Sequence, residues 1–289
     1  MAEIEVMQIP QWQNLSWLRY GFSTRSGGVS VVYGLPSLNL GWTKEDDPVK
    51  VAENRALLAE IVSGVAKETP PMKLVTLRQV HGNRIHRVDA AQVWAGRLET
   101  PEGKAVLEGD GLITDDPGIL LGAGTADCVP VLLADAVHGA VGAFHAGWRG
   151  TVARIVEHGV EAMRREFDSR PEGLHAAIGP SIGPCCYTVG EEVRDQFGME
   201  FPYAAELFDV IEAPDGAQHR RVNLWEANRR QLLNAGIPAE QIALVGECTS
   251  CAVDASGQRK YFSHRAEAGR TGRMLNVIGI AEKSPLGAR

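Results

Sequence analysis

The 289-residue sequence contains neither a long apolar run nor a long run of like charges. No apolar run approaches the ~18 residues that cross a bilayer, and the first ten residues, MAEIEVMQIP, carry acids where a secretion signal has a basic region. No five successive charges share a sign and the formal net charge is −7, so a nucleic-acid-binding face is not expected. We therefore expect a cytoplasmic protein that acts on a small molecule.

Cysteine is scarce, with five residues in the chain: Cys128, Cys185, Cys186, Cys248 and Cys251. An odd number at irregular spacing predicts free thiols rather than a disulfide framework. Residues 248–251 form one C-x-x-C, whose only possible partners for a closed zinc site are the adjacent Cys185 and Cys186. Because no second C-x-x-C exists, this pattern argues against a structural zinc site, and the context of a redox pair is also missing.

Several common functional motifs are absent. There is no G-x-G-x-x-G and no P-loop, which removes the usual dinucleotide-binding and NTP-binding interpretations. The nucleobase-deaminase signature is not met, because Thr188 stands where its second cysteine should be and no H-x-E occurs. No H-x-H pair is present, so a cluster of several histidine-bound coppers finds no support.

The chain is 44% hydrophobic and long enough to bury a large core. Asp47 as N-cap and Pro48 at the first helical position predict a helix over 47–63, followed by Gly64. Further strands and helices are indicated by apolar patterning. The expected strands are 73–80, 83–88, three within 118–145, and those in HAAIGP and QIALVGECT; the expected helices are 151–167, which starts at about Thr151, and 222–236, with Asn223 and Glu226 at capping-box spacing. Strand clusters interrupted by helices, without strict alternation, predict an α+β fold of mixed, layered sheets flanked by helices, in a single domain 1–289.

Three turn-like stretches carry residues suited to chemistry. His81 follows one strand in RQVHGNRI, Cys128 lies between two apolar runs in GTADCVPV, and His145 ends a buried strand in AFHAGWRGT. Each alone has a structural explanation: an exposed loop histidine, a buried cysteine, or a strand end sealed by Trp148. Together they form a nitrogen, sulfur, nitrogen set, which zinc binds with one position open in catalytic sites. Arg149, beside the start of the next helix, is suited to an anion.

At these motifs the sequence resembles a known family, the laccase-domain or polyphenol-oxidase-like proteins regarded as zinc-dependent purine nucleoside phosphorylases and related to peptidoglycan-editing factors. The resemblance extends over most of the chain, through the motifs GFSTRSGGVS (21–30), SLNLG (37–41), VAENRALL (51–58), QVHG (79–82), GDGLITD (109–115), TADCVPV (125–131), HAGWRGT (145–151), IGPSIGPCCYTV (178–189), VNLWEANRRQL (222–232), ECT (247–249) and FSHRAEAGRTGRM (262–274). One departure occurs in the last motif, where relatives usually have Tyr and two Arg and this chain has His264, Arg265 and Ala266.

The resemblance implies a catalytic zinc held by His81, Cys128 and His145, with copper as the other metal associated with the family. It implies phosphorolysis of adenosine, inosine, guanosine and methylthioadenosine, and hydrolytic deamination of adenosine. The motif residues suited to binding these substrates are arginines for phosphate and amides for base or ribose. We expect these to be Arg149, Arg55 and Arg25 for phosphate, and Asn39 and Gln79 for the nucleoside.

Three other functions remain open. Cys128 could be the nucleophile of an amide hydrolase with His145 as its base, acting on a peptidoglycan precursor. A copper-dependent polyphenol oxidase would correspond to the older family name. A non-enzymatic binding domain would tolerate substitution of His81 or Cys128.

Overall fold

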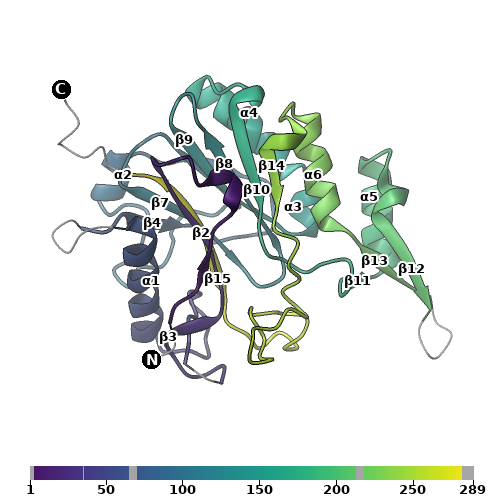
Figure 1. The fold of residues 1–289 in the computed structure, drawn as a ribbon, viewed down its shortest axis with the longest axis horizontal. Helices are drawn as coiled ribbons and strands as arrows, with labels where there is room; N and C mark the ends of the chain where they lie inside the picture. The colour runs from purple at the N-terminus through teal and green to yellow at the C-terminus, as the bar shows by residue number, and fades with distance from the viewer. Residues whose placement is uncertain (1–2, 35, 65–69, 213–217, 282–289) are drawn as a thin grey trace.

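Two β-sheets packed face to face form the centre of the computed structural model, which describes residues 3–34, 36–64, 70–212 and 218–281 (Figure 1). The five-stranded sheet has the order β1-β2-β15-β7-β4, formed by Val6–Met7, Leu18–Ser23, Met274–Ile280, Ile119–Thr125 and Lys73–Thr76. The six-stranded sheet has the order β14-β10-β8-β9-β6-β5, formed by Ile242–Leu244, Leu174–Ile178, Val129–Asp135, Ala140–Ala146, Gly111–Thr114 and Ile85–Arg87. Both sheets mix parallel and antiparallel pairs.

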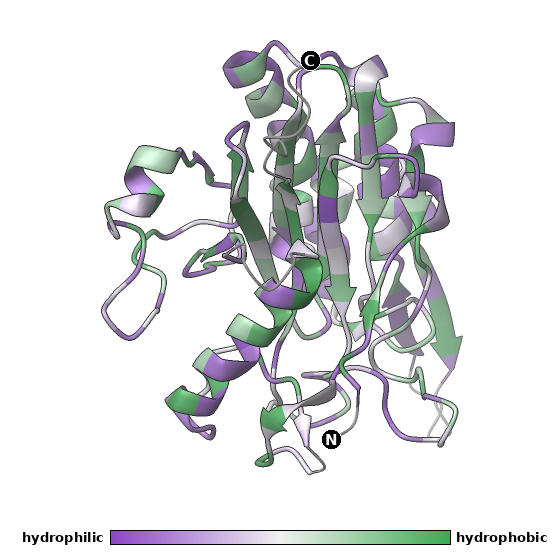
Figure 2. Ribbon diagram, turned by 60° about the vertical axis from the view of Figure 1, so that its left-hand side comes forward, coloured by the Kyte–Doolittle hydropathy of each residue, from purple (hydrophilic) through white to green (hydrophobic). Residues whose placement is uncertain are grey.

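Helices cover the outer faces of both sheets. The helices are α1 (Pro48–Ser63), α2 (Ala90–Trp94), α3 (Trp148–Val152), α4 (Ile155–Phe167), α5 (Glu191–Glu200) and α6 (Leu224–Asn234). Helix α1 packs on the five-stranded sheet through Leu58 and Val62, and α4 packs on the six-stranded sheet through Val156 and Val160. The strands of the two sheets, which lie between the helices, are largely apolar (Figure 2). Most of the core therefore lies between the sheets and between each sheet and its helices.

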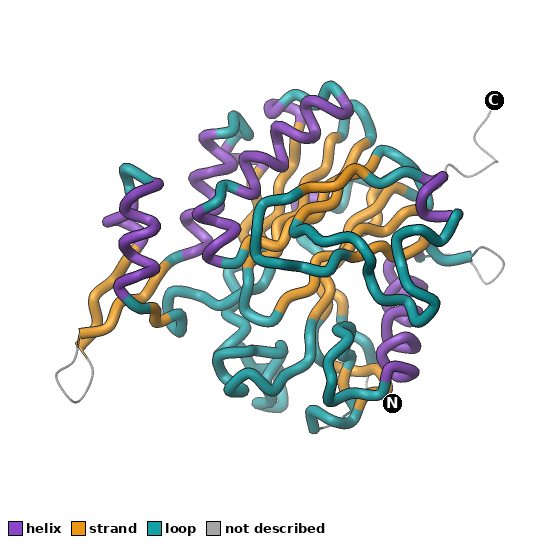
Figure 3. The backbone as a smooth tube through the Cα atoms, turned by 180° about the vertical axis from the view of Figure 1, so that it is seen from behind, coloured by secondary structure: helices purple, strands orange, loops and turns teal. Residues whose placement is uncertain are grey.

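A smaller sheet extends to one side. It has the order β11-β13-β12, formed by Thr188–Val189, Gln218–Val222 and Phe208–Glu212. The remaining elements are β3 (Ser26–Ser30) and the 3-10 turns Pro10–Trp12, Pro171–Gly173, Ala204–Leu207 and Ala239–Gln241. Figures 1 and 3, from opposite sides, show this small sheet and α5 projecting from the stacked layers.

The local signals in the sequence explain several element boundaries. The Asp47 side chain accepts a hydrogen bond from the Val49 N–H at 2.9 Å, and Gly64 ends α1 in the left-handed conformation with φ of 60°. At α6, Asn223 Oδ1 accepts the Glu226 N–H at 3.0 Å. The Glu226 carboxylate pairs with Arg230 rather than completing a reciprocal capping box. The predicted helices 47–63 and 222–236 are therefore confirmed, the second with shorter bounds.

The helix expected to start at about Thr151 differs in the structure. It begins at Trp148 as the short α3 and is interrupted at Arg154, which has φ of 56°, before α4 continues. The Arg154 guanidinium bonds the Glu200 carbonyl and the Glu157 carboxylate, and these contacts offset the cost of its left-handed backbone. Apolar periodicity alone did not reveal this break, because apolar residues continue across it: Val152 before the break is partly buried, and Ile155 after it is fully buried.

The three strands expected within 118–145 are confirmed as β7, β8 and β9, but β7 belongs to the five-stranded sheet and the other two to the six-stranded sheet. The predicted strand 73–80 ends at Thr76, after which the chain leaves the sheet toward the functional site. The α and β layered fold class is confirmed. Within the part of the chain described here, no helix combines the length and apolar character needed to cross a membrane.

Candidate active site

His81, Cys128 and His145 meet at one end of the stacked sheets. Cys128 directly precedes β8, and the pairing of Val129 with Ala146 places it next to the end of β9, where His145 lies. His81 comes from the turn between β4 and β5. The ligand atoms of the three side chains lie within 4.8 Å of one another. The fold thus joins residues that are 47 and 17 positions apart in the chain.

A buried carboxylate orients both histidines. Asp110 Oδ1 lies 2.9 Å from His145 Nδ1 and accepts the His81 main-chain N–H, also at 2.9 Å. Asp110 Oδ2 accepts the Gly82 N–H at 2.7 Å. Since Nδ1 of His145 is engaged, its Nε2 is the nitrogen left for the cluster. Metal-binding histidines are commonly held by a carboxylate in this way.

The backbone at the cluster is held in an uncommon conformation. His81 and Asp127 have φ of 61° and 91°, a region in which residues other than glycine are strained by about 1–3 kcal/mol. The His81 N–H bond to Asp110 stabilises the first position. At the second, Asp127 accepts the Thr249 hydroxyl at 2.7 Å and the Arg265 main-chain N–H at 2.7 Å. The strain is therefore located at the two turns that present the candidate ligands.

Gly147 leaves room for the cluster. A Cβ atom at this position would lie 3.0 Å from Cys128 Sγ and 3.3 Å from His81 Cδ2. Contacts this short would displace the Cys128 and His81 side chains by a few tenths of an ångström, so the absence of a side chain at Gly147 leaves their positions undisturbed.

The metal-free cluster favours a thiolate beside an imidazolium. Burial opposes ionisation of Cys128, but the neighbouring His145 and His81 outweigh it and lower the pKa of the thiol to about 6. Burial also disfavours a charged His145, yet Cys128 and Asp110 raise its pKa to about 9. Between these values the pair is charged, and the thiolate is the form that binds metals or attacks electrophiles.

Alkylation of the metal-free protein tests this charge state. Above pH ~6 Cys128 is the thiolate, so its rate of reaction with iodoacetamide should rise up to that pH and then level off. An ordinary thiol, with a pKa of 9.0, would continue to gain reactivity through neutral pH. Peptide mapping follows each site, with Cys185 as the slow internal control, because partial desolvation and the neighbouring Cys248 raise its pKa. A midpoint for Cys128 near 9 would contradict the charged pair.

The cluster lies in a cavity of about 680 Å³, within the usual range for small-molecule sites. Among the expected substrate-binding residues, Arg149, Arg55 and Gln79 line this cavity with the three candidate ligands. Arg149 is exposed, and its guanidinium carbon lies 4.3 Å from the centre of the Trp148 ring. No carboxylate among the described residues pairs with it. Arg149 is thus a cation available to a ligand.

Arg55 and Gln79 are engaged by the protein. Arg55 donates to the Leu40 carbonyl at 3.0 Å and to Thr76 Oγ1 at 2.9 Å, while burial lowers its pKa to about 10. Gln79 exchanges two hydrogen bonds with the Gly124 main chain, at 2.8 and 2.7 Å. Both residues remain part of the cavity wall, and Arg55 still carries its charge at neutral pH.

Arg25 and Asn39 do not line the cavity. Arg25 pairs with Glu267 at 3.0 Å and lies over the Phe262 ring. Asn39 is fully buried, and its side chain bonds the Arg273 N–H and Asp46 Oδ2 at 2.9 and 2.7 Å. The polar groups of these two residues therefore hold the loops beside the cavity together.

The sequence of the chain is similar to a known protein family. Residues 19–281 match the family model described as "Multi-copper polyphenol oxidoreductase laccase". The chain belongs to this family. A 39% identical protein of Deinococcus radiodurans, named "Purine nucleoside phosphorylase", aligns over 264 residues, which are 91% of this chain and 90% of the relative. The resemblance inferred from the motifs is confirmed at this level.

One further relative is named for a different activity, and another has a solved structure. "Adenosine deaminase RL5", from an unknown prokaryotic organism, is 35% identical over 258 residues, covering 89% of this chain and 92% of the relative. The crystal structure of YlmD from Geobacillus stearothermophilus matches with a TM-score of 0.79 at 37% identity, covering 95% of this chain and 94% of that one. The layered fold described above is thus shared with a solved laccase-family structure.

Two residues of the site could not be identified from the sequence: Asp110, which orients the cluster, and Tyr187, which lines the cavity. Asp110 lies in GDGLITD, and a carboxylate between two glycines indicates a turn without revealing that it is buried. Tyr187, which lines the cavity, follows the Cys185–Cys186 pair and carried no chemical signal of its own.

The segment FSHRAEAGRTGRM, residues 262–274, also contributes to the site. His264 and Arg265 line the cavity, and the Arg265 guanidinium lies 5.3 Å from the centre of the Tyr187 ring. The main-chain N–H of Arg265 bonds Asp127, beside Cys128. This strip therefore forms part of the cavity wall with its side chains and supports the cluster with its main chain.

Proposed function

We propose that the protein is a zinc-dependent purine nucleoside phosphorylase with adenosine deaminase activity. The observation that carries the proposal is the convergence of His81, Cys128 and His145 in a cavity that is also lined by Arg149, with which no carboxylate of the described residues pairs. The names of the Deinococcus radiodurans and RL5 relatives support the two activities. The reactions are nucleoside plus phosphate to base plus ribose 1-phosphate, and adenosine plus water to inosine plus ammonia.

The residues present fit a zinc ion. Two imidazoles and a thiolate are donors that zinc favours, and Asp110 supplies the outer carboxylate that such sites use. All three candidate ligands line the cavity, so a substrate there reaches them. When bound, zinc supplies Lewis acidity toward the purine and an activated water. Copper also takes imidazole and thiolate ligands and is the metal in the family description.

The chain itself binds and orients the substrates. Trp148 and Tyr187 are partly buried aromatic walls of the cavity and offer flat surfaces for a purine. Arg149 provides charge for phosphate, because its guanidinium is not paired within the described protein, and Arg55 adds positive charge deeper in the wall. Holding phosphate close to the ribose C1′ favours attack as the base leaves.

Purified protein with a measured metal content tests the proposal. Incubation with adenosine should give adenine and ribose 1-phosphate only when phosphate is present, and inosine in its absence. The Cys128→Ala variant should give neither product. Absence of every purine product, or full activity in the variant, would refute the assignment. Oxygen uptake with phenols by the copper-loaded protein would instead favour a polyphenol oxidase.

Substitution of Arg149 separates the two reactions. Methionine keeps an unbranched, flexible side chain but removes the guanidinium, and with it the charge and the contact with the Trp148 ring. Loss of a charged hydrogen bond costs about 1.5–3 kcal/mol, so the KM for phosphate should rise roughly 10–100-fold, while deamination, which uses no phosphate, is retained.

Arg78→Met is the matched control for this experiment, because Arg78 lines the same cavity but its guanidinium pairs with Glu108 at 2.6 Å. Steady-state kinetics with varied phosphate distinguish the variants. An unchanged KM for phosphate in Arg149→Met, or an equal rise in Arg78→Met, would remove Arg149 from the phosphate site.

One observation favours a second candidate function, a Cys128-dependent amide hydrolase. Cys128, His145 and Asp110 form a thiolate, imidazole and carboxylate series, with the pKa of the thiol lowered to about 6. This function predicts a covalent adduct at Cys128 and activity that survives removal of metal by a chelator. The phosphorylase predicts loss of activity on chelation and its return with zinc.

A further inference from the structure

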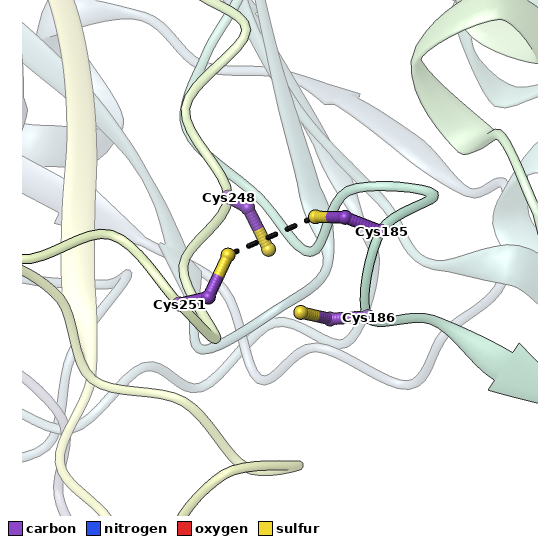
Figure 4. A group of neighbouring side chains, drawn as sticks. All are labelled: Cys185, Cys186, Cys248 and Cys251. Atoms are coloured by element: carbon purple, nitrogen blue, oxygen red, sulfur yellow. Dashed lines mark hydrogen bonds between the residues drawn. The ribbon is translucent and has the colours of Figure 1, made fainter.

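Four cysteines outside the active site converge on one point. Their sulfur atoms all lie within 4.8 Å of one another, and the side chains turn toward a common centre (Figure 4). The four are Cys185, Cys186, Cys248 and Cys251. The sulfur atoms of Cys185 and Cys251 are 3.7 Å apart, far beyond the ~2.05 Å of a disulfide bond.

Parallel pairing of two strands brings the cysteines together. β10 and β14 are parallel neighbours, so the loops that follow them leave the same edge of the sheet. Beyond these strands Ser181 and Cys248 continue the parallel pairing, with the Thr249 N–H donating to the Ser181 carbonyl at 3.1 Å. The adjacent pair 185–186 then faces the C-x-x-C turn 248–251. This pairing is non-local and could not be deduced from the spacing of the cysteines.

The distances suit a tetrahedral metal site. With zinc–sulfur bonds of about 2.3 Å, neighbouring sulfur ligands stand about 3.8 Å apart in a regular tetrahedron. The Cys185–Cys251 separation of 3.7 Å is close to this value, and the upper limit of 4.8 Å for the whole group requires only small side-chain movements. Soft thiolate ligands select zinc over hard cations.

The surroundings are those of a metal–thiolate site. The Gly183 main-chain N–H donates to Cys248 Sγ at 3.2 Å, a bond that stabilises a thiolate. A Cβ at Gly183 would lie 2.6 Å from Trp225 and 3.3 Å from Cys185 Sγ, so this turn closes tightly over the sulfurs. Arg259 donates to the Ser250 carbonyl and brings a positive charge beside the C-x-x-C turn.

We propose that Cys185, Cys186, Cys248 and Cys251 bind a second zinc ion in a closed, structural S4 site. Each thiol loses its proton to water as its sulfur binds the metal, and no ligand position remains open for substrate. The proposal reverses the expectation from the sequence, in which the missing second C-x-x-C argued against structural zinc. The adjacent pair 185–186 takes the place of that second motif.

The second site would hold two walls of the catalytic cavity. Thr249, inside the C-x-x-C turn, donates its hydroxyl to Asp127 at 2.7 Å, next to Cys128. Tyr187, next to Cys186, lines the cavity from the facing loop. A zinc ion that joins the two turns therefore fixes the position of Asp127 and Tyr187 without touching the substrate.

Metal stoichiometry tests the proposal on the full chain. Zinc-grown protein, dialysed against metal-free buffer and measured by mass-spectrometric metal analysis, should hold two zinc ions per chain. The Cys128→Ser variant should hold one, and the double variant C185S/C251S, which replaces two exposed cysteines, should also hold one. Cobalt bound to Cys128→Ser should give the intense absorption of a tetrahedral four-thiolate site, and cobalt bound to the double variant should not.

Three outcomes would overturn the second site. The first is a wild-type protein with one zinc ion that is lost completely in Cys128→Ser. The second is a double variant that retains both zinc ions. The third is a non-reduced protein whose intact mass is two hydrogens lower and whose mapped peptides join two of the four cysteines, since a disulfide would replace the thiolates. Cys128→Ser lacks a ligand of the proposed catalytic site, so zinc that it retains reports on the four-cysteine site alone. The measurements can therefore refute one zinc site while the other is retained.

Discussion

His81→Asn should abolish both proposed reactions while leaving the fold intact. Asparagine tolerates the left-handed backbone with φ of 61° that His81 adopts, and its main-chain N–H can still bond Asp110. The imidazole ligand is lost, however, and a catalytic metal contributes several kcal/mol of transition-state stabilisation. We expect kcat/KM for adenosine phosphorolysis to fall about a thousandfold. Steady-state kinetics and zinc analysis measure the two consequences together.

The matched control is His86→Asn, five residues away in the same segment. The ring of His86 lies beside the Glu108 carbonyl at 2.8 Å, and it does not line the cavity. This variant should keep its zinc and its activity. Equal losses in the two variants, or activity above a tenth of wild type in His81→Asn, would show that His81 is not a ligand.

Asp110→Asn should weaken zinc binding by about 10–100-fold, the usual cost of losing the carboxylate behind a metal-binding histidine. Both oxygens of Asp110 accept hydrogen bonds, from His145 Nδ1 and the main chain of His81 on one side and from Gly82 on the other. Asparagine replaces one acceptor with a donor, so one side must face another N–H group. Competition with a chromophoric chelator measures the zinc affinity.

Asp135→Asn separates this effect from the loss of a buried charge. Asp135 is also fully buried, lies 2.9 Å from His138 Nδ1, and accepts the main-chain N–H groups of Val137 and His138. It stands at the opposite end of β8 from Cys128. Both variants should melt at lower temperature, but only Asp110→Asn should lose zinc affinity. Equal zinc affinities would mean that Asp110 has a purely structural role.

Local chemistry made part of the fold predictable. Asp47, Pro48 and Gly64 mark the ends of α1, because capping and a left-handed C-cap are properties of a few neighbouring residues. The division of β7 from β8 and β9 between two sheets was not predictable, since all three strands are apolar on both faces. Periodicity shows that such strands are buried but does not show against which partner.

The candidate site shows the same limit. The motifs indicated His81, Cys128 and His145 as a group, but the role of Asp110 depends on burial behind them, which a turn-like sequence conceals. The four remaining cysteines required the parallel pairing of β10 and β14, a contact between residues more than sixty positions apart. Trp148 was expected to seal the end of a strand; it packs on the core cluster and also lines the cavity.

The bond between the Arg265 main chain and Asp127 tolerates substitution at position 265. Because the donor is a backbone N–H, every residue except proline can supply it, and the support of the Cys128 turn is independent of the side chain at that position. The side chains of His264, Arg265 and Ala266 can therefore be exchanged without removing the hydrogen bond that supports the Cys128 turn. Because His264 and Arg265 line the cavity, exchange of their side chains can alter the shape and charge of its wall while Asp127 keeps its support.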